Sequence, residues 1–428
     1  MIFEFRVKNY LSFKTEQKLS FEATSDSENE EYYCVEIKPG VKLLKTAIIY
    51  GANASGKTNL LIALNFLRDL ILKSPKDKEE EIEVIPFLLD EESRKEQTSF
   101  YLSFFIGSTK FVYSISLDKT RIYEEQLTYY PSVQPAKLYN RWYDEKTDST
   151  KIEFGNHLKF GQKDQIVITG NTLNNCTVMA SFAKSNVGSS ILNEVFQYFK
   201  KELKGILKPT MDLSGYTLRE LEKIPQMKPF ILEILKQSDF NICDLEVKKK
   251  DIVISPELSK TIQNSSLPDE RKKEYLDKGK IEQGEIVYTH DTAGLGTYSL
   301  PEGIESRGTT RYAGMAILLY HLIKENRVIP IDEIETSLHF ELLSYFIKLF
   351  LANGDKHSQL IVTTHDINLL NEDFIRRDAV WFTAKNEAGE SVLERLSDKG
   401  LHKNTSPYNA YKQGKLGAKP FTGNIFLS

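Results

Sequence analysis

The sequence predicts an α/β fold with a parallel core sheet that carries a phosphate-binding loop, and with a separate antiparallel β region. Three observations predict it. A glycine-bounded loop at 51–58 lies between an apolar, strand-like run and a helix-like run. Residues 82–145 are rich in Phe, Tyr, Ile and Thr, which favours antiparallel strands. Strand-like and helix-like segments alternate after residue 285, as they do in parallel sheets covered by helices.

The first elements surround the loop. Residues 2–8 and 17–22 are predicted to be short strands, because apolar and polar side chains alternate in the first of them. Residues 24–40 are polar and acidic and end in Pro-Gly, so they are predicted to form a surface loop. The apolar run 46–50 is predicted to be a buried strand, and residues 59–73 to be a helix.

The β region and the middle of the chain differ in pattern. Residues 100–105 and 111–117 alternate around a Gly-Ser pair, which predicts a β-hairpin within a domain that spans residues 1–150. Residues 151–284 are predicted to be an inserted, mainly helical domain, because two of their stretches carry helical apolar spacing. Two charge-dense runs, 248–251 and 269–280, are predicted to be solvated surface, with a nucleic-acid-binding patch as the alternative.

A third predicted domain, residues 285–400, alternates strands and helices. A basic, glycine-punctuated tail follows at 401–428, and it is either a packed or loose terminus or a docking segment. The predicted elements of this domain are a helix near 307–325, a strand near 327–332, a helix near 338–353, a strand near 358–363, a helix near 367–376 and a strand near 379–384.

Composition narrows the class of protein. The chain has 428 residues, of which 40% are hydrophobic and 27% are charged, as in ordinary globular proteins. Its net charge of −4 gives no overall attraction to nucleic acid. The cysteines Cys34, Cys176 and Cys243 form no CxxC pair, which argues against a structural zinc site and fits a reducing cytoplasm. No stretch approaches the roughly 20 apolar residues of a membrane span, so we expect a soluble, cytoplasmic protein.

The loop at 51–58 has the residues that phosphate binding requires. Gly51 and Gly56 let the backbone turn so that successive N–H groups, with the positive end of the next helix, hold phosphate oxygens. Lys57 is expected to reach the β- and γ-phosphates, and the Thr58 hydroxyl to bind Mg²⁺. The predicted ligands are therefore ATP and Mg²⁺.

Two later strands end in residues that could complete a hydrolytic site. Asp332 and Glu333 follow the apolar run 328–331; we expect Asp332 to hold Mg²⁺ and Glu333 to act as general base for the attacking water. Pro330 lies inside that run and requires a bulge or an unpaired position. His365 follows the next strand and could donate to the γ-phosphate or the water, although a single histidine there is often only a cap.

A second anion site is predicted at the start of the helix near 307. Ser306 followed by Gly308 offers a capping hydroxyl and free N–H groups. One subunit cannot easily place this site and the loop at 51–58 on the same phosphate, whereas a second copy of the chain could.

Together these segments resemble the ATP-binding-cassette-class ATPases of the SMC and recombination-repair type, in the branch that holds OLD-like and abortive-infection ATPases. The resemblance covers residues 1–70 and 285–385. The matching segments are Phe5 to Phe13, Gly51 to Asn59 with Asn53 and Asn59 among them, Glu305-Ser306-x-Gly308-Thr309, Asp332 to His339, and Thr364-His365-Asp366.

The resemblance implies an ATPase head that works as a head-to-head homodimer, or as a larger set of dimers, with ATP between the subunits. It adds Asn53, Ala54, Ser55 and Asn59 to the ATP-binding residues, and it implies that Ser306, Gly308 and Thr309 act in trans as the signature. Lys57, Glu333 and His365 would be the catalytic residues. The family's Q-loop glutamine has two candidates here, Gln97 and Gln126.

The resemblance also bears on the biological role. The segment between Thr58 and Glu305 is too short and too β-rich for a coiled-coil arm, which disfavours chromosome tethering. OLD-like nucleases carry a nuclease domain after the ATPase, and too few residues follow His365 for one. The resemblance therefore implies an ATPase that acts as sensor or scaffold in bacterial anti-phage defence, with a separate effector such as a nuclease. The alternative is a DNA repair or recombination ATPase that clamps DNA, and the ATPase subunit of a membrane transporter is a weaker third class.

Overall fold

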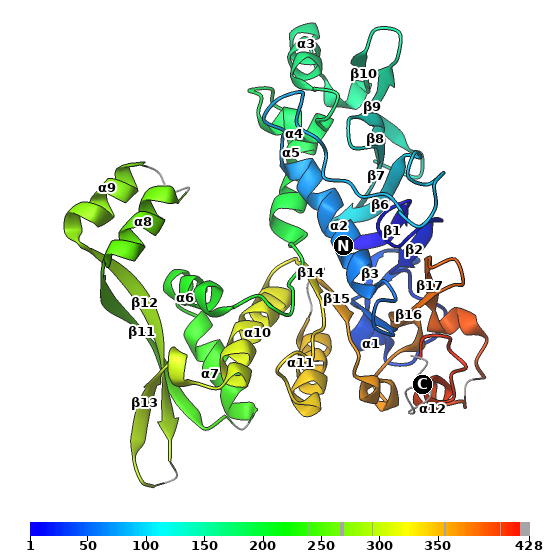
Figure 1. Ribbon diagram of the computed structural model, residues 1–428. Coiled ribbons are helices and arrows are strands. Elements are labelled where there is room, and N and C mark those ends of the chain that lie inside the picture. Colours follow the sequence, from blue (N-terminus) through cyan, green and yellow to red (C-terminus); the bar gives the residue numbers. More distant parts are fainter. Residues whose placement is uncertain (239, 266–268, 293, 355–356, 403, 420–428) are drawn as a thin grey trace, which may run out of the picture. The chain divides into compact units, whose positions relative to one another are not determined.

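The computed structural model describes residues 1–238, 240–265, 269–292, 294–354, 357–402 and 404–419 (Figure 1). The chain divides into two compact units. One combines Met1–Pro209 with His321–Ser428, and the other is the continuous segment Thr210–Tyr320. These units differ from the predicted ranges 1–150, 151–284 and 285–400. The last part of the predicted tail, residues 420–428, lies outside the described residues.

A five-stranded sheet forms one layer of the first unit. Its first four strands run parallel and the fifth pairs antiparallel, and every residue of the first three is buried. Because both faces of these strands are buried, their sequences are continuous apolar runs without alternating polar residues. The predicted α/β class with a parallel core sheet is confirmed. The strands, in spatial order, are β14 (Val328–Ile331), β15 (Gln359–Thr363), β5 (Thr46–Gly51), β16 (Val380–Lys385) and β17 (Ser391–Arg395).

The second layer is a seven-stranded antiparallel sheet. Helix α2 (Lys57–Leu72) packs on it through Phe66, whose ring centroid lies 5.3 Å from that of Tyr10 and 5.4 Å from that of Phe100. The predicted hairpin is the β6–β7 pair, so this β region is also confirmed. In spatial order the strands are β10 (Ser149–Phe154), β9 (Ala136–Asp144), β8 (Ile122–Tyr130), β7 (Thr109–Leu117), β6 (Thr98–Ile106), β1 (Ile2–Lys8) and β2 (Gln17–Ser20).

Two local predictions are wrong. The polar segment 24–40 is not a loop throughout: it holds the short helix α1 (Glu30–Tyr33) and the strand β3 (Cys34–Lys38), which pairs with β4 (Val41–Leu44). Tyr33 is fully buried and anchors this part against the core. The predicted helix at 367–376 is only the short 3₁₀ helix η4 (Ile367–Asn371). It ends at Glu372, where the backbone becomes extended and whose carboxylate pairs with Lys348 at 2.6 Å.

Pro330 lies in β14, an edge strand of the five-stranded sheet. Its neighbour on the outer side is the irregular segment 203–207, where the N–H of Leu207 donates to the Pro330 carbonyl at 2.9 Å and the N–H of Asp332 donates to the Leu207 carbonyl at 2.9 Å. The backbone carbonyl and nitrogen of Pro330 therefore point away from β15. The N–H that proline lacks would not have bonded to β15, so no hydrogen bond between the two strands is lost. The register between β14 and β15 has no shift, so the unpaired position, not the bulge, accommodates the proline.

Residues 151–209 belong to the first unit, although they were predicted to be part of the insertion. The Tyr198 ring stacks on Phe104 of β6 with centroids 4.4 Å apart, and the N–H of Lys204 donates to the Val328 carbonyl at 2.9 Å. Helical spacing in sequence shows that a face is apolar but not which partner covers it. The helical elements of this stretch are the 3₁₀ helix η1 (Asn156–Leu158), α3 (Gln162–Asn171), α4 (Val178–Ala183), α5 (Ser190–Gln197) and the π-helix η2 (Tyr198–Glu202).

The second unit mixes helices with a sheet. Its three strands pair antiparallel in the order β11-β12-β13, and the long β11–β12 ribbon carries helices α8 and α9 at one end (Figure 1). The charged run 248–251 lies on β11, where exposure of both faces removes the alternation that marks a strand. The elements are α6 (Ser214–Lys223), α7 (Met227–Gln237), β11 (Ile242–Val253), α8 (Pro256–Asn264), α9 (Asp269–Lys278), β12 (Lys280–Asp291), β13 (Thr297–Pro301) and the start of α10 (Arg307–Lys324).

Candidate functional site

The loop at 51–58 joins β5 to α2 and needs glycine at both ends for steric reasons. A Cβ on Gly51 would lie 2.4 Å from both the Ser55 and the Thr383 hydroxyl oxygens. Gly56 has φ 111° and a Cβ there would lie 2.3 Å from the Ser391 hydroxyl. No side chain fits at either position without moving its neighbours. The backbone is therefore held in the tight curve that a phosphate group can enter.

Lys57 lies inside this curve. Its side chain is buried, and its ammonium donates to the carbonyls of Gly51 at 2.8 Å and Ala52 at 3.2 Å. Burial lowers the pKa of this ammonium, while the carboxylates of Glu333 and Asp332 act in the opposite direction. The loop thus holds one desolvated cation at its centre, where phosphate oxygens would meet little competition from water.

The residues around Asp332 fit a magnesium site. The Thr58 hydroxyl donates to the Asp332 carboxylate, with both oxygens at 3.0 Å, and the Thr363 hydroxyl donates to the same carboxylate at 2.6 Å. Within the described residues, no group of three or more His, Cys, Asp or Glu side chains could hold a metal ion. One carboxylate and one hydroxyl suit Mg²⁺ in particular, since this ion keeps several waters and takes its other ligands from phosphate.

Glu333 and His365 lie near each other at the ends of β14 and β15. The Glu333 backbone is left-handed at φ 46°, and its N–H donates to the Thr363 hydroxyl at 2.8 Å. Its carboxylate oxygen Oε1 lies 3.8 Å from His365 Nε2, and both side chains are partly exposed. That separation is too long for a direct hydrogen bond and leaves both groups able to reach one water molecule.

Several predicted nucleotide-binding residues have protein partners for their side chains. The Ser55 hydroxyl is 2.6 Å from the Thr383 hydroxyl of β16, and the Asn59 amide donates to the Ser12 hydroxyl at 2.8 Å. These contacts anchor the two ends of the loop. Asn53 and Ala54 are exposed at its tip, and Ala54 has the positive φ of 61°.

The three predicted signature residues belong to the second unit. The Ser306 hydroxyl accepts from the N–H of Thr309 at 3.0 Å and lies 2.8 Å from the Thr309 hydroxyl. Ser306 therefore caps the first turn of α10, as predicted for a serine at a helix start. Gly308 lies in that same turn. Their action in trans stays a prediction.

The two candidate glutamines lie in the β region. Gln126 is on β8 and lines a small groove on the antiparallel sheet with Arg6, Tyr101 and Asn140. Gln97 precedes β6, and its carbonyl accepts from the Asn9 amide at 3.5 Å. Among the described residues, no hydrogen bond joins either glutamine to Asp332 or to the phosphate loop.

Sequence reasoning missed the residues that connect the site. Thr363 binds both the Asp332 carboxylate and the Glu333 N–H, and the Glu335 carboxylate accepts from the His365 N–H at 2.7 Å. A signal was present, because two threonines end an otherwise apolar strand. The residues that Thr363 binds could not be predicted, because they follow β14, and only the fold places β14 next to β15.

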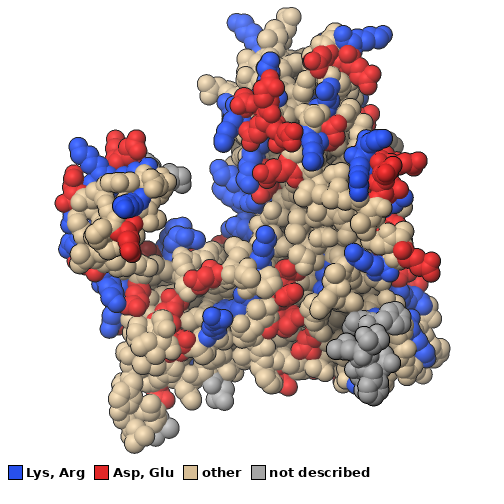
Figure 2. Space-filling model, in the orientation of Figure 1, with Lys and Arg blue, Asp and Glu red and all other residues tan. Residues whose placement is uncertain are grey.

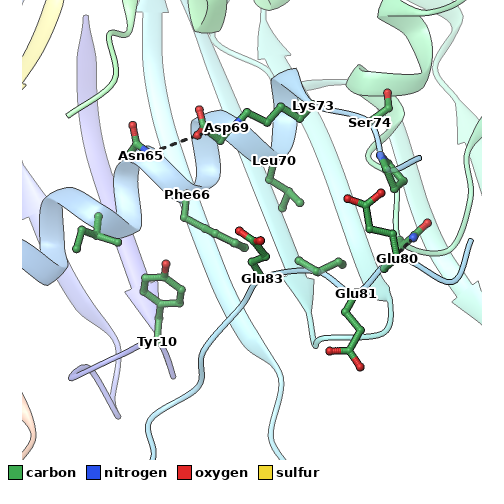
Figure 3. A pocket seen from close by; sticks show the side chains of 14 residues that line it. Tyr10, Asn65, Phe66, Asp69, Leu70, Lys73, Ser74, Glu80, Glu81 and Glu83 are labelled. Atoms are coloured by element: carbon green, nitrogen blue, oxygen red, sulfur yellow. Dashed lines mark hydrogen bonds and ion pairs between the residues drawn. The ribbon is translucent and has the colours of Figure 1, made fainter. Parts of the chain in front are cut away.

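A separate cavity of about 350 Å³ lies along the second half of α2 (Figure 3). Tyr10, Phe66 and Leu70 give it apolar walls, and Glu80 and Glu83 direct their carboxylates toward α2 (Figure 3). A triphosphate carries several negative charges and would be repelled by these carboxylates. This cavity is therefore unsuited to the nucleotide.

A comparison with protein-family models finds a family of AAA domains whose match includes the phosphate loop at 51–58. The model of a family described as "AAA domain, putative AbiEii toxin, Type IV TA system" matches residues 47–171 and 222–371, more than half of the chain. No curated protein matches the chain. Within the described part of the chain, every helix is too short or too polar to span a lipid bilayer.

Solved structures of SMC heads are similar at low sequence identity. The SMC head domain from Thermotoga maritima is 13% identical, with 92% of this chain and 98% of that chain covered and a TM-score of 0.41. An SMC head bound to the C-terminal winged-helix domain of ScpA is 11% identical, with 93% and 99% covered and a TM-score of 0.44.

Proposed function

Because the chain belongs to this family of AAA domains, we propose that it is an ATPase that binds ATP with Mg²⁺ and hydrolyses it. The observation that carries the proposal is the cluster at the ends of β5, β14 and β15. There, Lys57 lies in the loop and the Thr58 hydroxyl contacts the Asp332 carboxylate at 3.0 Å. The test is phosphate release by the purified chain in Mg²⁺, compared with its Glu333→Gln variant. Absence of phosphate release by the unmodified chain, or equal release by a folded Lys57→Ala variant, contradicts the proposal.

In the proposed mechanism the loop amides and Lys57 would hold the phosphates, and Thr58 and Asp332 would hold Mg²⁺. The bound Mg²⁺ would neutralise charge on the phosphate oxygens. Glu333 accepts a proton from the attacking water through its carboxylate, and His365 orients that water or the terminal phosphate. Thr363 positions Glu333, because its hydroxyl holds the Glu333 N–H at 2.8 Å.

The proposed active form is a homodimer in which Ser306, Gly308 and Thr309 of one subunit contact the terminal phosphate bound by the other. The support is chemical: Ser306 precedes and caps α10, and at this helix start N–H groups and the helix dipole favour an anion. ATP would then favour the closed dimer, and hydrolysis would release it.

Ser306→Arg is expected to leave ATP binding intact while it blocks dimer closure and lowers turnover by at least about tenfold. The bulky cation would occupy the place of the partner's phosphate. Ser306→Ala is the matched control, since it also removes the helix cap, at a cost of about 1 kcal/mol, but adds no bulk. ATP titration, phosphate release and light scattering measure the three effects. Turnover of the Arg variant equal to that of the unmodified chain would refute closure at Ser306.

For the biological role, we propose a sensor or scaffold in anti-phage defence that acts with a separate effector, for example a nuclease. The support is the family description, which names a putative AbiEii toxin and a type IV TA system. In a bacterial host that carries the chain with its neighbouring gene, phage plaque counts are expected to fall. Lys57→Ala should restore them to the level of unprotected cells. Protection that persists in this variant would contradict an ATP-dependent role.

The DNA-clamping alternative needs a basic surface. In the second unit, cations and carboxylates alternate along the β11–β12 ribbon and its helices (Figure 2). Lys280 pairs with Asp251 at 2.6 Å, and Lys278 pairs with Glu274 at 2.7 Å. Mixed charge of this kind is typical of a solvated surface, so it does not favour the alternative.

A further inference from the structure

A cavity of about 680 Å³ lies beside the phosphate loop, and the C-terminal segment forms part of its wall. Its volume is in the range of small-molecule sites. All of its lining belongs to the first unit. The lining residues are Gly51, Ala52 and Asn53 of the loop, His365 and Ile367 after β15, and Tyr411, Lys412 and Lys419 of the C-terminal segment.

The C-terminal segment is built into the core. Helix α12 (Pro407–Lys412) packs against η4, and the Tyr411 ring stacks on Phe382 of β16 with centroids 6.0 Å apart. The Tyr411 hydroxyl donates to the Ala418 carbonyl at 3.1 Å, which folds the chain back toward the helix. Leu416 and Ala418 are almost fully buried. The segment up to residue 419 is therefore a fixed wall of the cavity.

This wall carries two cations. The Lys412 and Lys419 side chains are exposed, and the Lys419 ammonium donates to the Lys412 carbonyl at 2.9 Å. The Lys412 ammonium donates to the Tyr408 hydroxyl at 3.1 Å. Among the described residues, neither ammonium forms an ion pair with a carboxylate. The Lys412 ammonium also lies 4.9 Å from the centroid of the Tyr408 ring. The partners of both ammonium groups are therefore neutral, and an anion in the cavity would compete with no carboxylate for either charge.

We propose that Lys412 and Lys419 form a second cationic wall of the nucleotide site and bind the terminal phosphate of the nucleoside triphosphate. This inference rests on the proposed function, in which the loop binds ATP. The cavity includes the start of the loop and His365, the side on which the attacking water would lie. The terminal phosphate carries the most charge on that side, and an ammonium is a compact donor for phosphate oxygens.

The experiment measures the Kd of ATP and of ADP for the double variant Lys412→Gln/Lys419→Gln by calorimetry. The Kd of ATP is expected to rise at least about tenfold, which is about 1.4 kcal/mol, with a clearly smaller rise for ADP. Lys415→Gln is the matched control, since Lys415 is an exposed lysine of the same segment outside the cavity lining. The double arginine variant keeps both charges and should bind ATP as the unmodified chain does.

Each other outcome is decisive. An unchanged Kd of ATP in the double glutamine variant, while Lys57→Ala loses ATP, overturns the second wall and leaves the proposed function standing. Tighter ATP binding would also overturn it, because the segment would then shield the site. An equal rise for ADP, or for the Lys415 control, would rule out a contact with the terminal phosphate. If Lys57→Ala binds ATP normally, the proposed function fails and this inference fails with it.

Discussion

Replacing Lys57 with alanine is expected to abolish measurable ATP binding, with a rise in Kd of at least about 100-fold, or about 2.7 kcal/mol. The reason is the position of the side chain: Lys57 is 5% exposed as a residue, and its ammonium lies 2.8 Å from the Gly51 carbonyl, at the centre of the loop. A desolvated ammonium makes charge-assisted hydrogen bonds of about 1.5–3 kcal/mol each. Isothermal titration with ATP and Mg²⁺ measures the change.

Two further variants separate lost charge from lost packing. Lys57→Met keeps the aliphatic stem and removes only the ammonium, so it should lose ATP as the alanine variant does. Lys73→Ala is the surface control, because that lysine follows the same helix and its side chain is 73% exposed. Thermal unfolding shows whether each variant is folded. Normal ATP affinity in folded Lys57→Ala and Lys57→Met proteins would remove Lys57 from the site.

Glu333→Gln is expected to bind ATP normally, to lower turnover by about 10²–10⁴-fold, and to accumulate as a dimer in ATP. The substitution preserves shape and the backbone bond to Thr363 at 2.8 Å, but the amide accepts no proton from water. The ATP-bound state therefore persists. Phosphate release measures turnover, and light scattering with and without ATP measures assembly.

The matched control for Glu333 is Glu341→Gln, which neutralises an exposed carboxylate in the first turn of α11 (Phe340–Asn353). This variant should keep normal turnover and assembly. If the Glu333 variant also turns over normally, Glu333 is not the general base. If it stalls but stays monomeric in ATP, the base is retained and the dimer proposal is contradicted.

The same stalled protein decides between the two biological roles. With ATP, a DNA-clamping ATPase should bind duplex DNA tightly, and its affinity should fall steeply with salt as counterions are released. A defence scaffold that acts through a separate effector needs no such affinity. Salt-dependent duplex binding would favour the clamp, and its absence would count against it.

The parts that sequence predicted well are those set by neighbours in the chain. Gly51 and Gly56 bound the loop because any side chain there would clash within a few residues or with the adjoining strands. The buried strands β5 and β15 could be predicted because both faces are covered, which leaves a continuous apolar run. Ser306 was recognised as a helix start because its hydroxyl binds the N–H three residues later.

The misplaced parts depend on partners far away in the chain. Tyr198 packs on Phe104, and no periodicity in either segment reveals that pairing. The ribbon formed by β11 and β12 is exposed over its charged half, so its strands carry no alternating pattern there. The boundaries between the two compact units of the chain fall after residue 209 and after residue 320. The sequence pattern predicts domain boundaries near residues 150 and 284.

By itself, the sequence determined the phosphate loop, the order of the acidic and histidine residues that follow it, and the α/β class, since each depends on local backbone geometry and burial. Only the tertiary structure decided that Thr363 joins Asp332 to Glu333 and that Lys412 and Lys419 line the cavity beside the loop. These contacts cross from one strand to the next or span most of the chain. They form because the parallel sheet brings the ends of its strands to one edge. The spacing of residues along the sequence does not show which strand ends become neighbours.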